Sequence, residues 1–203
     1  WVNPKYRGII PLNQYHIPRS LKKIIRRGIF KITFNKNFQS VVQLCAKKGP
    51  KRQNTWINQP IKESVIKLHK MGFAHSIECW KDGTLAGGLY GISLGAAFFG
   101  ESMFSDFSNA SKVALVYLLA QLKMGNYRLL DTQFITAHLT QFGAIEISDN
   151  DYLEQLENAL KFQSNFHSNP ELSALQLSIS KVLRGSTKLT HLDSCKFHFA
   201  EKL

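Results

Sequence analysis

The chain has 203 residues, and its 26 Lys and Arg against 14 Asp and Glu give a formal charge of +12. A composition of 44% hydrophobic and 20% charged residues is that of a globular domain, which excludes intrinsic disorder over most of the length. The longest apolar stretches, such as residues 94–100, are far shorter than the roughly 20 residues of a membrane-spanning helix, so we expect a soluble protein.

Cysteine and histidine spacing gives no sign of a metal or disulfide site. Cys45, Cys79 and Cys195 are scattered, none at the C-x-x-C spacing of zinc or redox sites, and no two of the seven histidines lie four residues apart. We therefore expect no metal, no cofactor, and a reducing, cytoplasmic location. The chain begins with Trp1 and has no signal-peptide pattern, so we expect a fragment whose N-terminus lies upstream.

The positive charge is concentrated in the first third of the chain. Residues 1–62 contain fourteen Lys or Arg and no acid, whereas residues 63–203 carry twelve bases and fourteen acids. Segregated positive charge is typical of a protein that binds a polyanion, because each cation that meets a phosphate releases condensed counterions. A merely solvated basic face is the alternative.

The first predicted element is a basic amphipathic helix at residues 19–28. Leu21, Ile24 and Ile25 recur at helical spacing, the basic residues fill the other face, and Gly28 is a typical helix end. Because the segment is short and has no aromatic anchor, it favours RNA phosphates over a membrane surface as the partner. A strand at 31–34 and helices at 38–47 and 61–71 follow.

The middle of the chain predicts an antiparallel meander. Strands are expected at 74–80, 85–92 and 96–101, with an Asp82-Gly83 hairpin turn. The glycines of this stretch match no phosphate-binding motif. The later elements, taken in order, are a helix at 112–123 capped by 108–111, a strand at 129–131, a short helix at 134–139, a strand at 144–147 and a helix at 152–160. This order predicts an α+β fold with helices packed on a sheet.

Two acids lie in apolar surroundings where an unpaired carboxylate is costly. Glu101 lies in the sequence Phe-Gly-Glu-Ser-Met, and Asp131 ends a predicted buried strand. Each is a candidate for catalysis, and a structural cap is the alternative for Asp131. Trp56 follows a basic loop and is a candidate either for the core or for stacking on a base.

With these residues in view, the chain resembles the bacterial leucyl/phenylalanyl-tRNA–protein transferase family over residues 1–160. The matching motifs, in order, are Trp1-x-x-Pro4-x-x-Arg7 with 8–12, Thr55-Trp56-Ile57, 74–78 with 87–91, 100–105, 109–112, Leu130-Asp131-x-Gln133, and 142–144. The resemblance implies a mixed, mostly antiparallel GNAT-like (acyl-CoA N-acyltransferase-like) domain at 14–162. Residues 1–13 would be the end of a small N-terminal domain, and 163–203 depart from the family pattern, so that tail receives no role.

The resemblance implies transfer of Leu or Phe from its tRNA to the α-amine of proteins that begin with Lys or Arg, marking them for degradation. Residues 106–111 lack the glycine loop that holds acetyl-CoA in acetyltransferases, which supports another donor. Two alternatives remain: a non-catalytic tRNA-binding module, and a peptidoglycan-type aminoacyltransferase that acts on a muropeptide amine.

The resemblance also implies roles for individual residues. Asp131 and Gln133 would be the catalytic pair, with Asp131 polarising Gln133; because a carboxamide is a weak base, we expect Gln133 to orient the amine and Asp131 to supply a negative field. Glu101 and Asp131 are the candidates to bind the acceptor's cation. The remaining implied residues are Leu89, Phe98, Gly100, Met103, Leu115, Leu118 and Leu130 for the aminoacyl pocket, Trp1 and Trp56 for the terminal adenosine, and Arg19, Lys23, Arg26 and Arg27 for the tRNA acceptor stem.

Overall fold

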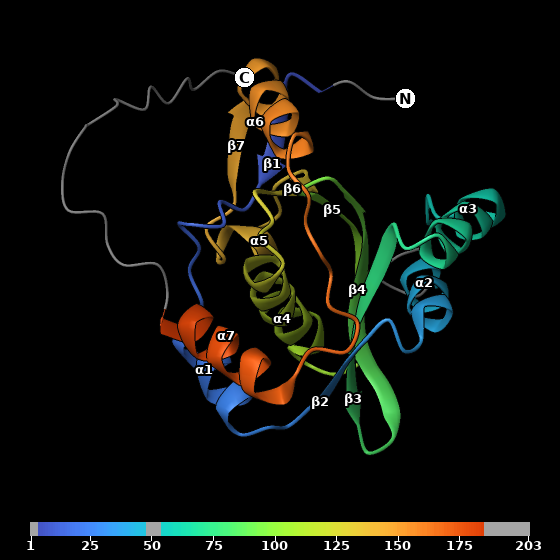
Figure 1. Cartoon of the computed structure of the whole chain (residues 1–203). Helices are drawn as coiled ribbons and strands as arrows, with labels where there is room; N and C mark the ends of the chain where they lie inside the picture. The colour runs from blue at the N-terminus through green and yellow to red at the C-terminus, as the bar shows by residue number, and fades with distance from the viewer. Residues whose placement is uncertain (1–3, 48–53, 185–203) are drawn as a thin grey trace, which may run out of the picture.

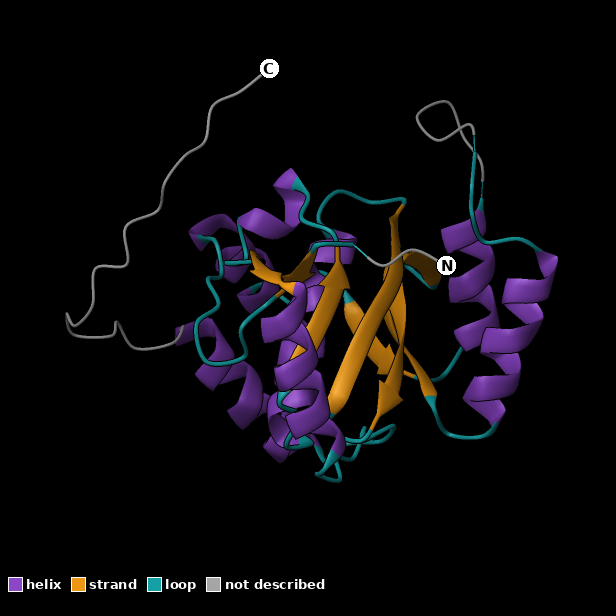
Figure 2. Cartoon of the chain, turned by 90° about the horizontal axis from the view of Figure 1, so that it is seen from above, coloured by secondary structure: helices purple, strands orange, loops and turns teal. Residues whose placement is uncertain are grey.

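A computed structural model describes residues 4–47 and 54–184, and within them a seven-stranded sheet carries helices on both faces (Figures 1 and 2). The strand order is β2-β3-β4-β5-β6-β1-β7. The strands are β1 (Tyr6–Ile9), β2 (Lys31–Phe34), β3 (Ala74–Lys81), β4 (Thr84–Leu94), β5 (Ala97–Ser105), β6 (Leu129–Gln133) and β7 (Ile145–Ser148). The helices are α1 (Arg19–Arg26), α2 (Phe38–Ala46), α3 (Gln59–Lys70), α4 (Ala110–Met124), α5 (Ala137–Thr140), α6 (Asp149–Leu160) and α7 (Leu172–Arg184).

The sheet is mostly antiparallel, as predicted, and its central pair, β5 and β6, is parallel. β2, β3, β4 and β5 pair antiparallel, and the β3–β4 hairpin turns at Asp82 and Gly83, both with positive φ, as a tight turn between right-twisted strands requires. β5 and β6 are parallel because α4 connects them as a crossover helix. The mixed, mostly antiparallel sheet packed by helices is therefore confirmed.

Helix α4 lies at the centre of the molecule between the sheet and a second layer of helices (Figure 1). Eleven of its residues are buried, which agrees with its apolar sequence on all sides. One face packs on β3 and β4, and the opposite side contacts α1 and α7. Helices α2 and α3 cover the other face of the sheet with a second core cluster.

The structure extends or corrects several predicted elements. β5 continues to Ser105, four residues beyond the expected end, and the helix expected at 134–139 is the single turn α5. The N-cap of α4 is Asn109, within the expected segment, but the helix begins at Ala110 rather than Lys112, and Ser105 Oγ rather than the Asn109 side chain accepts a first-turn amide, that of Ser111 at 3.3 Å. β1 and α7 were not predicted.

Residues 163–184 pack against the core rather than extending away from it. Phe166 stacks on His75 and on Phe98, Gln121 Nε2 donates to the His167 carbonyl at 2.8 Å, and Ser178 Oγ donates to the Ala120 carbonyl at 2.9 Å. The described part of the predicted tail therefore completes the outer layer over α4.

Candidate active site

The candidate site begins where two parallel strands separate. β5 and β6 pair only over Ala97–Phe99 and Leu129–Asp131, although β5 runs on to Ser105. A cavity of about 530 Å³ lies beside the part of β5 that pairs with β4 but no longer with β6, and α4 contributes Leu115 and Leu118 to its wall. The splayed strands thus create an apolar cavity inside an otherwise packed sheet.

Six of the seven residues expected in the aminoacyl pocket line this one cavity: Leu89, Gly100, Met103, Leu115, Leu118 and Leu130. Phe98 is the exception. It is fully buried at a position where β5 still pairs with Leu130 of β6, and its ring packs against Phe166 and Tyr127 in the core instead.

Several lining residues were missed by the sequence reasoning, including Thr132, Phe134 and His138. Thr132 Oγ1 and His138 Nε2 are buried and have no hydrogen-bond partner among the described residues. Burial and the nearby Lys112 lower the pKa of His138, so its imidazole is neutral at pH 7. The cavity wall therefore offers two uncharged polar groups within an apolar surface.

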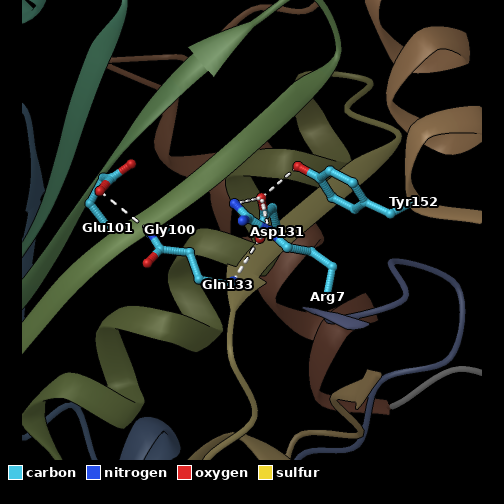
Figure 3. Close-up of polar contacts among 6 residues, drawn as sticks. All are labelled: Arg7, Gly100, Glu101, Asp131, Gln133 and Tyr152. Atoms are coloured by element: carbon cyan, nitrogen blue, oxygen red, sulfur yellow. Dashed lines mark hydrogen bonds and ion pairs between the residues drawn. The ribbon is translucent and has the colours of Figure 1, made fainter. Parts of the chain in front are cut away.

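Asp131 lies beside the cavity at the centre of a saturated hydrogen-bond network (Figure 3). Its side chain is fully buried, and it forms an ion pair with Arg7 of β1, whose Nη2 is 2.7 Å from Oδ2. Arg7 Nε lies 3.1 Å from both oxygens, and the Tyr152 hydroxyl of α6 donates to Oδ2 at 2.6 Å. Burial and the adjacent carboxylate raise the pKa of Tyr152, so the hydroxyl keeps the proton that it donates.

The remaining donor to Asp131 is the main chain of Gln133, whose amide nitrogen is 2.6 Å from Oδ1. Gln133 has φ 65°, a left-handed conformation that is uncommon for a residue other than glycine. The register against β1 shifts at the same place, since Ile9 faces Asp131 and Gly8 faces Gln133. This bulge redirects the Gln133 side chain, as bulges beside active sites commonly do.

The Gln133 carboxamide reaches the second acid of the site. Its Nε2 donates to Glu101 Oε2 at 3.3 Å and to the Gly100 carbonyl at 3.4 Å (Figure 3). Because both partners are acceptors, the nitrogen must face them, and among the described residues the Gln133 carbonyl oxygen has no hydrogen-bond partner. An acceptor oxygen is therefore available next to the cavity.

Glu101 is the acid of this site whose charge is not paired within the described residues. Burial raises its pKa, as does the charge of Asp131, while the Gln133 amide and Arg7 oppose that shift. Arg7 forms its ion pair with Asp131 instead. Glu101 is thus the carboxylate of the site that gains most from an incoming cation.

The contacts of Asp131 differ from those expected for its two roles, which stay predictions. The carboxylate accepts from the Gln133 main chain and makes no direct contact with its carboxamide, and both oxygens already accept from Arg7, Tyr152 or that amide. Since the group is also fully buried, it has no oxygen free for the acceptor's cation. Arg7 and Tyr152 had no expected role, although Arg7 belongs to a motif noted in the sequence.

The other expected site residues lie away from the cavity wall. Arg19, Lys23 and Arg26 are exposed on α1, and Arg27 is exposed at its C-cap; the helix contacts α4, and its apolar residues pack in the core. Trp56 is 48% exposed and does not line the cavity. Trp1 lies outside the described residues.

The described residues contain no group of three or more His, Cys, Asp or Glu that could hold a metal. Within the same residues no helix is long and apolar enough to cross a membrane.

A family model described as "Leucyl/phenylalanyl-tRNA protein transferase" matches residues 9–157. A protein of that name from Zymomonas mobilis subsp. mobilis is 56% identical over 160 residues, which are 79% of this chain and 60% of the relative. Another from Maricaulis maris is 54% identical over 170 residues, covering 84% and 79%. A solved structure of a functionally unknown protein from Staphylococcus epidermidis has a TM-score of 0.44 at 13% identity, covering 70% of this chain and 57% of that one.

Proposed function

The chain belongs to the leucyl/phenylalanyl-tRNA–protein transferase family, and on that premise we propose that it transfers Leu or Phe from aminoacyl-tRNA to proteins that begin with Lys or Arg. The product would be marked for degradation through its new N-terminus. The observation that carries the proposal is the apolar cavity between β5 and β6, whose wall includes Glu101, the hydrogen-bond partner of Gln133. A GNAT-like domain is part of the same proposal, supported by the antiparallel meander, the α4 crossover and the splayed parallel pair.

The cavity is suited to the side chain of the transferred amino acid. Its lining is predominantly apolar, so transfer of a leucyl or phenylalanyl side chain from water into it is favourable. Met103 is flexible and polarisable, which allows one cavity to take two shapes. Thr132 and His138 belong to the wall, and each would bond polar atoms of the aminoacyl-adenosine end through a side chain whose Oγ1 or Nε2 atom has no other partner among the described residues.

The reaction is aminolysis of an ester, which needs a neutral amine held close to the ester carbon. An α-amine with a pKa of ~8 is partly neutral at pH 7, so positioning can supply much of the rate. The Gln133 carbonyl oxygen would accept a hydrogen bond from the attacking amine and fix its direction. The amine's proton then passes to the ribose oxygen that leaves, directly or through water.

We assign the acceptor's Lys or Arg side chain to Glu101. The cation would add a charge-assisted hydrogen bond to a carboxylate that otherwise has only the long 3.3 Å contact from Gln133, and it would hold Glu101 ionised against the effect of burial. The α-amine of the same residue would then lie near Gln133, since Glu101 and Gln133 are already in contact.

The exposed cations of α1 and the exposed Trp56 would serve the tRNA. Arg and Lys contacts to phosphate give affinity without sequence information, and an exposed Trp can stack on a base. We therefore expect the acceptor stem and the aminoacyl group to determine donor choice.

The test is single-turnover transfer of labelled Leu from tRNA to matched peptides that begin with Arg, Lys, citrulline or Ala. We expect transfer to the Arg and Lys peptides, and Glu101→Gln should reduce it about 10- to 100-fold, the effect of losing one charge pair in a half-buried site. Glu146→Gln on β7 is exposed and serves as the control for charge removal.

The outcomes separate the alternatives. Salt-sensitive tRNA binding without transfer to any amine would indicate a non-catalytic binding module. Transfer to a muropeptide amine and not to an Arg peptide would indicate a peptidoglycan-type enzyme. An equal loss on Arg and citrulline peptides in Glu101→Gln would remove Glu101 as the cation's partner.

A further inference from the structure

We propose that Arg7 and Tyr152 are positioning residues of the transfer reaction, which hold the Asp131 carboxylate so that it fixes the left-handed turn at Gln133. The kinetic part of this inference rests on the proposed function, whereas the structural part does not. Neither residue lines the cavity, so both would act through Asp131 and Gln133 rather than on the substrate.

The first argument is the set of donors that surround the two oxygens of Asp131. Oδ2 accepts from Arg7 Nη2 at 2.7 Å and from the Tyr152 hydroxyl at 2.6 Å, and Arg7 Nε lies 3.1 Å from both oxygens. Two donors from different directions fix the rotation of the carboxylate, and Oδ1 is thereby directed at the Gln133 amide, 2.6 Å away. Without those donors the carboxylate could rotate, and the short contact to Gln133 would be lost for part of the time.

The second argument is the conformation that this contact maintains. Gln133 has φ 65°, which is energetically unfavourable for a residue with a side chain, so surrounding contacts must maintain it. A side-chain oxygen that accepts from the amide two residues ahead is a recognised way to stabilise such a turn. The direction of the Gln133 carboxamide, and its contact with Glu101, therefore depend on Asp131.

The third argument is that Arg7 and Tyr152 support each other. The Arg7 guanidinium lies over the Tyr152 ring, 5.2 Å from its centroid. Three elements, β1, β6 and α6, thus meet at one carboxylate (Figure 3). The charged or titratable groups that act on Asp131 are Arg7 from β1, Tyr152 from α6 and Glu101 from β5.

The test uses Tyr152→Phe and Arg7→Lys in the full chain, with Tyr127→Phe as the control. Tyr127 is 7% exposed, as Tyr152 is, and its hydroxyl bonds Ser93 at 2.7 Å, so the control loses a comparable hydrogen bond away from Asp131. The first readout is amide hydrogen exchange at Gln133 by NMR. We expect its protection to fall about tenfold or more in both test variants and to be unchanged in the control.

The second readout is kinetic. We expect kcat for an Arg peptide to fall about tenfold or more in both test variants, with KM for the peptide within twofold, because positioning affects the transition state more than binding. Arg7→Lys keeps the positive charge but loses the paired Nε and Nη2 hydrogen bonds to Asp131, so it should retain more activity than Arg7→Met, which loses both.

Each outcome decides one proposal. Unchanged Gln133 protection in both test variants would overturn the positioning role, whatever the activity. A raised KM with unchanged kcat would also overturn it, because the residues would then act in binding. A wild-type chain that transfers to no amine would overturn the proposed function alone, and the exchange data would still decide the role of Arg7 and Tyr152.

Discussion

Replacing Gly8 with Ala should disturb the contact between β1 and the bulge of β6. A Cβ at Gly8 would lie 2.9 Å from the Phe134 carbonyl carbon and 3.1 Å from both the Ile135 nitrogen and Thr132 Oγ1. Two of these three atoms are main chain and cannot move aside by rotating a side chain. β1 must therefore shift away from β6, and Arg7, the residue before Gly8, must shift with it.

The size of the effect follows from those distances. Overpacking of this kind costs about 1–3 kcal/mol. For a protein of this length each kcal/mol lowers Tm by roughly 2–4 °C, so thermal unfolding followed by circular dichroism should show a decrease of about 2–12 °C. Transfer activity should also fall, since the Arg7–Asp131 pair would be displaced.

Two further variants make the Gly8→Ala result interpretable. Tyr6→Thr on the same strand replaces a 62% exposed side chain and should leave Tm within about 2 °C. Adding Thr132→Ala to Gly8→Ala removes only one of the three close contacts, so recovery should be partial. A Gly8→Ala chain as stable as wild type would refute the reasoning, because the strands would then separate at no cost.

Two other predictions concern pH and the C-terminal helix. Burial lowers the pKa of His75 to about 4, with a smaller contribution from His69. As the pH falls below about 6.5, His75 therefore binds a proton in the unfolded chain before it does so in the folded one. The free energy of unfolding should consequently decrease between about pH 6.5 and 4. Urea unfolding at both ends of that range should show a smaller decrease for His75→Gln, which keeps an acceptor for Asn35, and an identical decrease would contradict the assignment. In α7, Leu183→Ala should lower the free energy of unfolding by about 2–5 kcal/mol, because Leu183 is 7% exposed. Leu177→Ala, at a position 55% exposed, should lower it by less than about 0.5 kcal/mol. Equal decreases in the two variants would mean that α7 does not pack on α4.

Much of the fold could be predicted because its longer elements carry local signals. The helix at α4, the hairpin at Asp82-Gly83 and the strand before Asp131 were each found from period and turn residues. β1 could not be predicted in this way. Its four residues include Gly8 and show no alternation, and its strand conformation comes from pairing with β6 and β7. The helical spacing of Leu175, Ile179 and Val182 in α7 was readable, but nothing local shows that this helix docks on α4.

The candidate site also has a part that local sequence patterns predict and a part that depends on long-range contacts. Residues of the cavity wall belong to strands and a helix whose apolar pattern and family motifs are local, so six of the seven lie together. Phe98 could not be separated from them, because only the structure shows that β5 and β6 part after Phe99. The roles of Arg7 and Tyr152 depend on contacts with Asp131 across 124 and 21 residues of sequence, and no periodicity reports such contacts.

The pairing of Arg7 with Asp131 across 124 residues has a consequence for how the protein is made. During synthesis Arg7 leaves the ribosome long before Asp131 and Tyr152, so β1 cannot pair with β6 and β7 until those strands have been synthesised. Contacts of such long range form slowly, because closing the intervening loop costs entropy before any contact compensates for it. We therefore expect the β3–β4–β5 meander to fold first and the site around Asp131 to assemble last, so that a nascent chain gains activity only after α6 has emerged.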